Sequence, residues 1–400
     1  VAIIRGTLAD ENGNITLDKE GVLLEQLSIA QAAKRWGGIV ICQVEAVVKA
    51  GSLHPKAVKV PGLLVDYVVI GKPENHMQSI ATQFNPALCG DIKVPTGSLV
   101  PMPLDERKVI ARRAAMEVTP GAITNLGIGI PAGIPTVAAE EGVSDLLTLS
   151  IESGVNGGIP AQLGDFGLAY NAESIIEQSF QFDFYDGGGL DASFLGLAQT
   201  DSHGNVNVSK FNGRPVGCGG FINITRSTKK LVFCGSFTAG GLDVKVGEGK
   251  LTIVQEGKAR KFIDQVEQVT FNGHDAALRE QQVVFVTERA VFHLREDGLE
   301  LTEIAPGVDL ERDVLNDCGN MSAPTVLFVL ERLIERGLPE RGSSSKPSIR
   351  YSIKRRRHLP TVASQMSNRS ATTLLCSPAA QARTIRQRSE SERVTRCRRT

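Results

Sequence analysis

The sequence lacks the features of several specialised protein classes. It has no apolar run near the roughly 18 residues that a membrane-spanning helix needs. It begins at Val1 with a strand-like stretch, where a signal peptide would show a basic region and a cleavage site. Its seven cysteines include no Cys-x-x-Cys pair, and its six histidines show no metal-ligand spacing. We therefore expect a cytoplasmic protein without disulfides, a metal site or membrane association.

The formal net charge of zero hides two differently composed segments. Residues 341–400 contain 15 Lys and Arg against 2 Glu, whereas residues 1–340 contain 29 basic and 42 acidic residues. The basic segment also holds eleven serines and a single aromatic residue, Tyr351. Because such a composition buries too little apolar surface to fold, we expect residues 316–400 to form an atypical, disordered basic tail.

Two interpretations of this tail remain open. A basic tail can bind nucleic acid or a membrane surface. It can also be a run-on translation unrelated to the folded part, which fits better because few aromatic residues lie among the charges. We expect no nucleic-acid partner.

The rest of the chain alternates strand and helix patterns, which predicts an α/β fold with largely parallel sheets. Residues 1–85 read as strands around one helix, and four prolines mark a linker at 86–104. Residues 105–315 resume the alternation from a helix that Asp105 caps. In this part the segment INITR, 222–226, reads as a strand.

An internal repeat with a long period joins the two folded segments. GTLADENGNITLDKEG in the first corresponds to GLAQTDSHGNVNVSKFNG in the second, and Gly13-Asn14 matches Gly204-Asn205 at an offset of 191. IVICQVE and LVFCGSF correspond at nearly the same offset. Two matches in register predict a duplicated fold whose first copy is truncated at its N-terminus.

The stretch Gly127-Ile128-Gly129-Ile130-Pro131 follows a strand and opens a helix, so backbone amides converge there. Such a turn suits an anion or a developing oxyanion. A dinucleotide-binding loop is the competing interpretation, although its third glycine falls one position late and Pro131 removes an amide. A purely structural tight turn is a third possibility.

Glu152 stands where a buried strand, LLTLSI, runs into the glycines of ESGVNGGIP. Ligands of open parallel sheets bind at the carboxyl ends of the strands. A carboxylate at such an end can act as nucleophile, general base, metal ligand or plain helix cap. Further glycine clusters at 187–189 and 217–220 leave room for a long ligand close to the backbone.

These motifs together resemble the family I coenzyme A transferases, in particular the single-chain short-chain acyl-CoA (acetate/propionate) branch. ESGVNGGIPA resembles the catalytic loop of that branch, NLGIGIP its oxyanion motif, and GCGGF a CoA-contacting loop. IRGTLADENGNIT, GSLHPKAVKVPGLLVDYVV and PENHMQ resemble the second part of the α-like domain. VTERAVFHL and GLELTEIAPGVDLERDVL resemble the end of the β-like domain.

The resemblance implies that residues 1–85 are the second part of an α-like domain and residues 105–315 a β-like domain. It implies that Glu152 forms a glutamyl-CoA thioester. It also implies that coenzyme A contacts seven residues in two glycine loops: Gly127, Ile128, Gly129, Ile130, Pro131, Gly219 and Gly220. The implied reaction moves CoA from a short-chain acyl-CoA to acetate or a related carboxylic acid, in a homo-oligomer without a permanent cofactor.

The chain departs from the family pattern at both ends, because it lacks the first part of the α-like domain and ends in the basic tail. We therefore expect impaired activity. An acyl-CoA hydrolase on the same scaffold and an inactive product of a disrupted gene are the alternatives.

Overall fold

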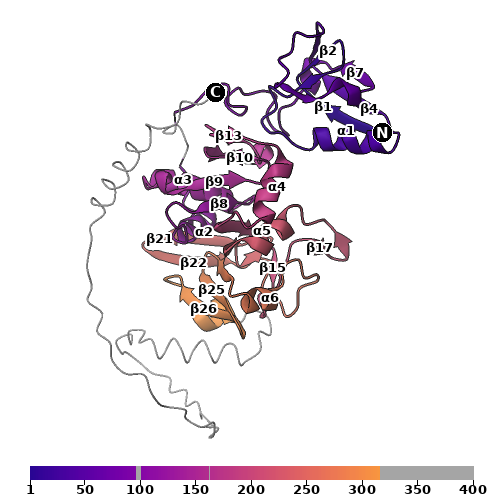
Figure 1. Cartoon of the computed structure of the whole chain (residues 1–400). Coiled ribbons are helices and arrows are strands. Elements are labelled where there is room, and N and C mark those ends of the chain that lie inside the picture. Colours follow the sequence, from indigo (N-terminus) through magenta and orange to yellow (C-terminus); the bar gives the residue numbers. More distant parts are fainter. Residues whose placement is uncertain (96–100, 162, 316–400) are drawn as a thin grey trace, which may run out of the picture. The chain divides into compact units, whose positions relative to one another are not determined.

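The computed structural model of the chain describes residues 1–95, 101–161 and 163–315 (Figure 1). The disordered tail expected at 316–400 lies outside these residues. Within the described part of the chain, no helix is both long and apolar enough to cross a bilayer.

The first segment contains a small parallel sheet of strand order β1-β4-β7. Its strands are β1 (Ala2–Arg5), β4 (Val40–Val44) and β7 (Tyr67–Ile70). Alternate residues Val40, Cys42 and Val44 are buried and pack with Ala30 of helix α1 (Gln26–Arg35). The period of two in the strand therefore directs one face of the sheet against the helix. A second sheet has the order β5-β2-β3-β6, with bounds Ala46–Val48, Leu8–Asp10, Ile15–Thr16 and Val58–Val60.

The internal repeat is confirmed down to individual hydrogen bonds. In the first copy, Asp10 accepts hydrogen bonds from the backbone and the side-chain amide of Asn14, both at 2.9 Å. In the second copy, Asp201 accepts the same two bonds from Asn205 at 3.1 and 3.0 Å. Each carboxylate thus closes the same turn, which is the usual role of Asp in an Asx turn.

Two glycines outside the repeated sequence segments also occupy equivalent positions in the two copies. The backbone N–H of Gly62 donates to the side-chain oxygen of Asn14 at 2.9 Å, and that of Gly273 donates to Asn205 at 3.0 Å. A Cβ atom would fall 2.0 Å from a backbone oxygen at Gly62 and 2.1 Å from one at Gly273. Only glycine fits such an approach.

A nine-stranded sheet forms the centre of the second segment, in the order β13-β10-β9-β8-β14-β19-β24-β25-β26. Its central strands run parallel to one another. They are β9 (Thr148–Ile151), β8 (Ile123–Leu126), β14 (Ala192–Gly196), β19 (Lys230–Cys234) and β24 (Gln282–Val286). The antiparallel edge strands are β13 (Ser174–Ile175), β10 (Val155–Asn156), β25 (Ala290–Arg295) and β26 (Gly298–Ile304).

Helices cover both faces of this sheet. Leu231 and Phe233 of β19 pack in the same cluster as residues of α4 (Gln178–Asp186), α5 (Phe221–Ser227) and α6 (Gly273–Leu278). Val232 and Cys234, which alternate with them, pack with residues of α2 (Glu106–Ala115) and α3 (Ile134–Glu140). A strand buried on both faces reads as a continuous apolar run, as LVFC does. The α/β fold with mainly parallel sheets is therefore confirmed.

Short elements complete the described chain. Five two-stranded antiparallel sheets pair Ile159–Pro160 (β11) with Ala169–Tyr170 (β12), Gln199–Thr200 (β15) with Val206–Asn207 (β16), Lys210–Phe211 (β17) with Arg214–Pro215 (β18), Thr238–Ala239 (β20) with Ala259–Arg260 (β23), and Asp243–Gly247 (β21) with Lys250–Gln255 (β22). Short 3₁₀ turns are Gly62–Leu64, Pro73–Asn75, Pro131–Gly133, Ser144–Leu146 and Leu163–Asp165, and Glu311–Leu315 is a π turn.

Two local predictions have opposite outcomes. Asp105 caps α2 as predicted, because its side chain accepts a hydrogen bond from the backbone N–H of Lys108 at 3.0 Å. The strand predicted at 222–226 is wrong, because these residues lie in helix α5. Phe221, Ile224 and Thr225 are the buried residues of α5, and this spacing of three and four is helical. Packing of that face outweighs the strand preference of the β-branched residues.

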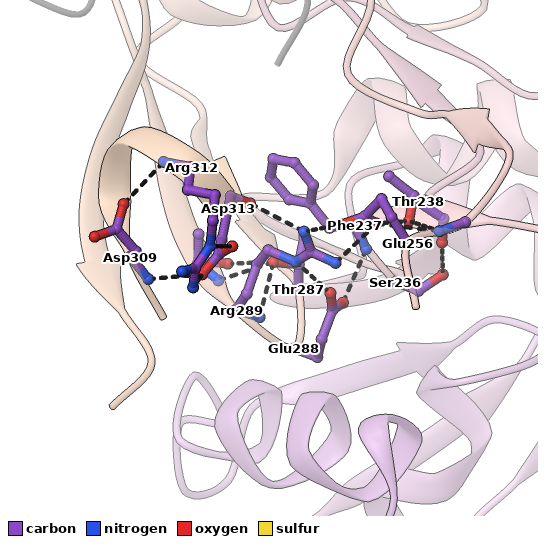
Figure 2. A network of polar contacts seen from close by, with 12 residues as sticks. Ser236, Phe237, Thr238, Glu256, Thr287, Glu288, Arg289, Asp309, Arg312 and Asp313 are labelled. Atoms are coloured by element: carbon purple, nitrogen blue, oxygen red, sulfur yellow. Dashed lines mark hydrogen bonds and ion pairs between the residues drawn. The ribbon is translucent and has the colours of Figure 1, made fainter. Parts of the chain in front are cut away.

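A buried ion network fastens the end of the described chain to the sheet (Figure 2). The side chain of Arg289 is fully buried, and its Nε donates to the equally buried Glu288 at 2.7 Å. Its Nη1 donates to Glu256 at 2.8 Å and to the backbone oxygen of Asp313 at 2.9 Å. The guanidinium also lies over the ring of Phe237, 4.8 Å from its centroid. Three segments distant in sequence thus share one cation.

We expect Arg289→Met to destabilise the protein by about 3–5 kcal/mol, because it leaves Glu288 buried without its partner. Urea unfolding followed by circular dichroism measures the loss. Lys49→Met is the matched control, since Lys49 pairs with Glu11 in solvent. Equal stabilities of the two variants would contradict the role assigned to the network.

Candidate active site

A cavity of about 420 Å³ joins the predicted site segments. Gly127, Ile128, Glu152, Gly219 and Gly220 all line it, although they come from three separate parts of the chain. The other lining residues are almost all apolar: Phe166, Leu195, Gly196, Leu197, Ala198, Val208, Cys218, Phe221 and Ile224. The cavity lies at the carboxyl ends of β8, β9 and β14, where parallel sheets bind ligands.

A tight turn after β9 presents Glu152 to this cavity. β10 turns back antiparallel to β9, with Val155 opposite Ile151. Gly154 makes the turn at φ +102°, and a Cβ there would fall 2.0 Å from the backbone oxygen of Ile176. The backbone therefore requires glycine at position 154.

The carboxylate of Glu152 is half-buried and unpaired. Among the described residues, none donates a hydrogen bond to it or forms an ion pair with it, and no other charged side chain lines the cavity. Burial raises the pKa of Glu152, because an apolar environment disfavours the charged form. An unpaired carboxylate with a raised pKa in a cleft is a candidate catalytic group, because perturbed pKa values are concentrated at active sites.

The loop at 127–131 contributes to the cavity only in part. Gly127 and Ile128 line it, whereas Gly129, Ile130 and Pro131 do not. The N–H of Gly127 donates to the backbone oxygen of Phe194 at 2.7 Å, so it closes the sheet and is not free for a ligand. Gly129 adopts φ +89° with open space around it. Any amide donor from this loop must come after Gly127.

The loop at 217–220 lies against the carboxylate. A Cβ at Gly220 would fall 3.3 Å from Oε2 of Glu152 and 2.7 Å from Cζ of Phe182. Gly219 has φ +53° and open space around it. The N–H groups of Gly219 and Gly220 donate to no described residue, so they can serve an incoming oxyanion.

The sequence did not reveal the apolar wall of the cavity. Leu197 and Ala198 directly follow β14, so the rule that ligands meet strand ends could have found them. Phe166 comes from a loop with no sequence signal of its own. Within the described residues, no group of three His, Cys, Asp or Glu side chains is arranged to hold a metal ion.

Comparisons with known proteins find relatives of one kind. Residues 1–71 match the family model described as coenzyme A transferase. The chain is 50% identical over 322 residues to caffeate CoA-transferase of Acetobacterium woodii, an alignment that covers 79% of this chain and 61% of that protein. It is 46% identical over 335 residues to acetate CoA-transferase YdiF of Escherichia coli O157:H7, covering 83% of this chain and 63% of YdiF. The chain is therefore similar to coenzyme A transferases over about four fifths of its own length.

Solved structures show the same similarity. The crystal structure of the YdiF acyl-CoA transferase apoenzyme from E. coli O157:H7 matches with a TM-score of 0.73 at 46% identity, over 80% of this chain and 59% of that one. A thioester complex of the same enzyme with CoA matches with a TM-score of 0.71. The chain spans about three fifths of the length of these relatives.

We expect Glu152→Gln to raise the melting temperature at neutral pH. Because burial raises the pKa of Glu152, the charged form is unfavourable in the folded protein, and glutamine removes the charge with little change in shape. The difference in melting temperature between this variant and wild type should narrow as the pH falls, because the wild-type carboxyl then becomes protonated. Thermal melts over a pH series measure it.

Glu117→Gln is the control of opposite sign. Burial alone would raise the pKa of Glu117, but hydrogen bonds from Lys230 and Arg113 outweigh burial and hold this pKa below its ordinary value. Its substitution should therefore lower the melting temperature at neutral pH. If the difference in melting temperature between Glu152→Gln and wild type widened in acid, the raised pKa assigned to Glu152 would be wrong.

Proposed function

We propose that this protein transfers CoA from a short-chain acyl-CoA to acetate or a related short-chain carboxylate, with Glu152 as the nucleophile. The observation that carries the proposal is the unpaired carboxylate in an apolar cavity between two glycine loops. The named relatives are CoA-transferases, and one solved relative is a thioester complex with CoA.

In the first half-reaction, the carboxylate of Glu152 attacks the thioester carbonyl of the acyl-CoA. The tetrahedral intermediate expels CoA thiolate and leaves an acyl-glutamyl anhydride. The thiolate then attacks the glutamyl carbonyl, which releases the first carboxylate and leaves a glutamyl-CoA thioester.

In the second half-reaction, the acceptor carboxylate attacks the glutamyl-CoA thioester and displaces the thiolate. The thiolate attacks the acyl carbonyl of the new anhydride, so a new acyl-CoA forms and Glu152 returns as a carboxylate. No water is consumed, and the energy of the thioester is kept. The scheme is ping-pong, because the first acid departs before the second binds.

Each step develops negative charge on a carbonyl oxygen beside Glu152. The N–H groups of Gly219 and Gly220 donate to no described residue and lie next to the carboxylate, so they are our candidate oxyanion donors. A donor in such a position contributes about 2.7–4 kcal/mol to transition-state stabilisation. The apolar wall with Phe166 and Leu197 limits water, which would otherwise hydrolyse the thioester.

Coenzyme A acts in this scheme as a substrate, and no permanently bound cofactor takes part. A homo-oligomer and a cytoplasmic location stay predictions. So do the boundaries of the linker at 86–104, although Leu88 within it is buried against Ala161 and Leu168.

Incubation with acetyl-CoA alone should add the mass of CoA less that of water to the peptide that contains Glu152. Peptide mass spectrometry measures the adduct, which should be absent from Glu152→Ala. The caffeate CoA-transferase of A. woodii, treated identically, is the reference. If that enzyme forms the adduct and this chain forms none, the proposal is wrong for this chain. A reduced yield would agree with the expected impairment.

Gly220→Ala should reduce formation of this adduct by about 10- to 100-fold, because the added methyl group displaces the carboxylate or the ring of Phe182. The initial rate of adduct formation at saturating acetyl-CoA measures the effect. Gly247→Ala is the matched control, since a Cβ at Gly247 meets open space. Equal rates in both variants would contradict the packing argument.

The acyl-CoA hydrolase alternative is tested with the same reagents. A hydrolase consumes acetyl-CoA continuously when no acceptor acid is present, whereas a transferase stops after one equivalent of adduct. Because the adduct keeps the sulfur of CoA in a thioester with the enzyme, continuous release of free thiol would favour the hydrolase.

A further inference from the structure

A buried polar network lies behind the strand that ends at Glu152. The hydroxyl oxygens of Ser150, in β9, and Tyr185, in α4, are 2.7 Å apart. Asn125 of β8 donates its side-chain amide to the Tyr185 hydroxyl at 3.3 Å, and Gln181 of α4 donates to the Ser150 hydroxyl at 2.9 Å. All four side chains are buried.

The two hydroxyl groups of this network carry one more proton than the hydrogen bond between them requires. Ser150 and Tyr185 each carry one hydroxyl proton, and the single hydrogen bond between them consumes one. Asn125 and Gln181 donate to the two hydroxyl oxygens through their amide nitrogens. The side-chain oxygen of Gln181 accepts from Asn156 at 3.1 Å and that of Asn125 has no described partner, so neither oxygen accepts the other proton. No other described residue accepts a hydrogen bond from either hydroxyl group. One hydroxyl proton is therefore uncommitted.

The network is also less stable than an apolar core of the same volume would be. The side-chain oxygen of Asn125 is buried and has no hydrogen-bond partner among the residues that the structure describes. Burial of an acceptor without a donor costs stability, and apolar side chains would fill the same space without that cost. Departures from good packing of this kind are concentrated at functional sites.

The network is placed to act on Glu152. Ser150 lies in β9, two residues before Glu152, which stands in the turn that directly follows this strand. Phe182 of α4 makes an edge contact with Tyr185, with ring centroids 5.9 Å apart. The ring of Phe182 and the carboxylate of Glu152 lie next to the same point, the missing Cβ of Gly220.

The electrostatics are consistent with this placement. Burial is the main cause that raises the pKa of Tyr185 to about 12, and the charge of Glu152 adds to it. Tyr185 therefore keeps its proton at neutral pH. The other titratable group at the cavity is the thiol of Cys218. In the loop of Phe166, the carboxylate of Asp165 accepts a hydrogen bond from Thr82 at 2.9 Å. The turn after Glu152 contributes no titratable side chain, and Cys218 is the one titratable residue of the two glycine loops.

We propose that Tyr185 is a positioning residue for Glu152: Ser150 donates to the Tyr185 hydroxyl, whose own proton then directs its dipole toward the carboxylate and favours the ionised nucleophile. The inference rests on the proposed function for its catalytic meaning, but the interaction itself is present without a substrate. The dipole offsets part of the cost of burying the charge of Glu152.

The test is Tyr185→Phe in the full 400-residue chain, which removes the hydroxyl and keeps the ring. A water-soluble carbodiimide with an amine modifies protonated carboxyl groups, and peptide mass spectrometry follows the modification of Glu152 against pH. Loss of the dipole should raise the midpoint of this titration by about 0.5–1 pH unit. On the acid side of the midpoint, the rate of CoA-adduct formation should fall about 3- to 10-fold.

Tyr170→Phe is the matched control, because the hydroxyl of Tyr170 makes no hydrogen bond to a described residue; its midpoint should equal that of wild type. A residue that only supports the fold would lower the melting temperature without moving the midpoint. A midpoint that is unchanged or lower in Tyr185→Phe overturns the proposal. If Tyr185→Phe does not fold, Ser150→Ala replaces it, with a smaller upward shift expected and the same outcome decisive.

The two readouts separate this inference from the proposed function. The carbodiimide titration needs no acyl-CoA, so it reports on Tyr185 even if the chain forms no CoA adduct. Normal adduct formation with an unshifted pH profile in Tyr185→Phe would remove the positioning role and leave the transferase mechanism intact.

Discussion

Parallel pairing of β9, β8 and β14 is the constraint on which the candidate site depends. Parallel strands send their carboxyl ends to the same edge, so Glu152, Gly127 and Leu197 meet there despite their separation in sequence. The register matters as much as the direction. A slip of one residue in β9 would turn Ser150 toward the opposite face of the sheet, away from its partners in α4.

The protein buries charge in two contrasting ways. Arg289 has no exposed side-chain surface, but carboxylates, a backbone oxygen and an aromatic face surround it (Figure 2). This complete pairing lets the cation join three segments. Glu152 is less buried and has no partner among the described residues. A carboxylate committed to a partner could not attack a thioester, so the missing interaction is what keeps the proposed nucleophile available. The proposed role of Tyr185 is intermediate, because its neutral hydroxyl dipole would stabilise the charge of Glu152 without forming an ion pair.

The repeated turns show how one solution to a backbone problem is used twice. Asp10 and Asp201 close equivalent loops with nearly equal hydrogen bonds, and glycines receive the chain at equivalent points. In the second copy the turn lies just beyond the strand end that lines the cavity, so a structural motif shared by both halves supports a site in one of them.

The sequence by itself determined the features that are local or periodic. These include the alternation of strand and helix, the cap at Asp105, the repeated Asp-x-x-Gly-Asn turn, and the position of Glu152 between a strand and glycines. Each of them depends on residues a few positions apart. Tertiary structure decided the rest. Helix α5 forms at 222–226 because the core accepts Phe221 and Ile224 on one face. The N–H of Gly127 is lost to Phe194, a residue 67 positions away, and Gly220 is needed because Phe182 and Glu152 approach it from other elements. The cavity and the uncommitted proton behind it arise only when distant segments pack, because which groups a side chain meets is a property of the fold and not of its neighbours along the chain.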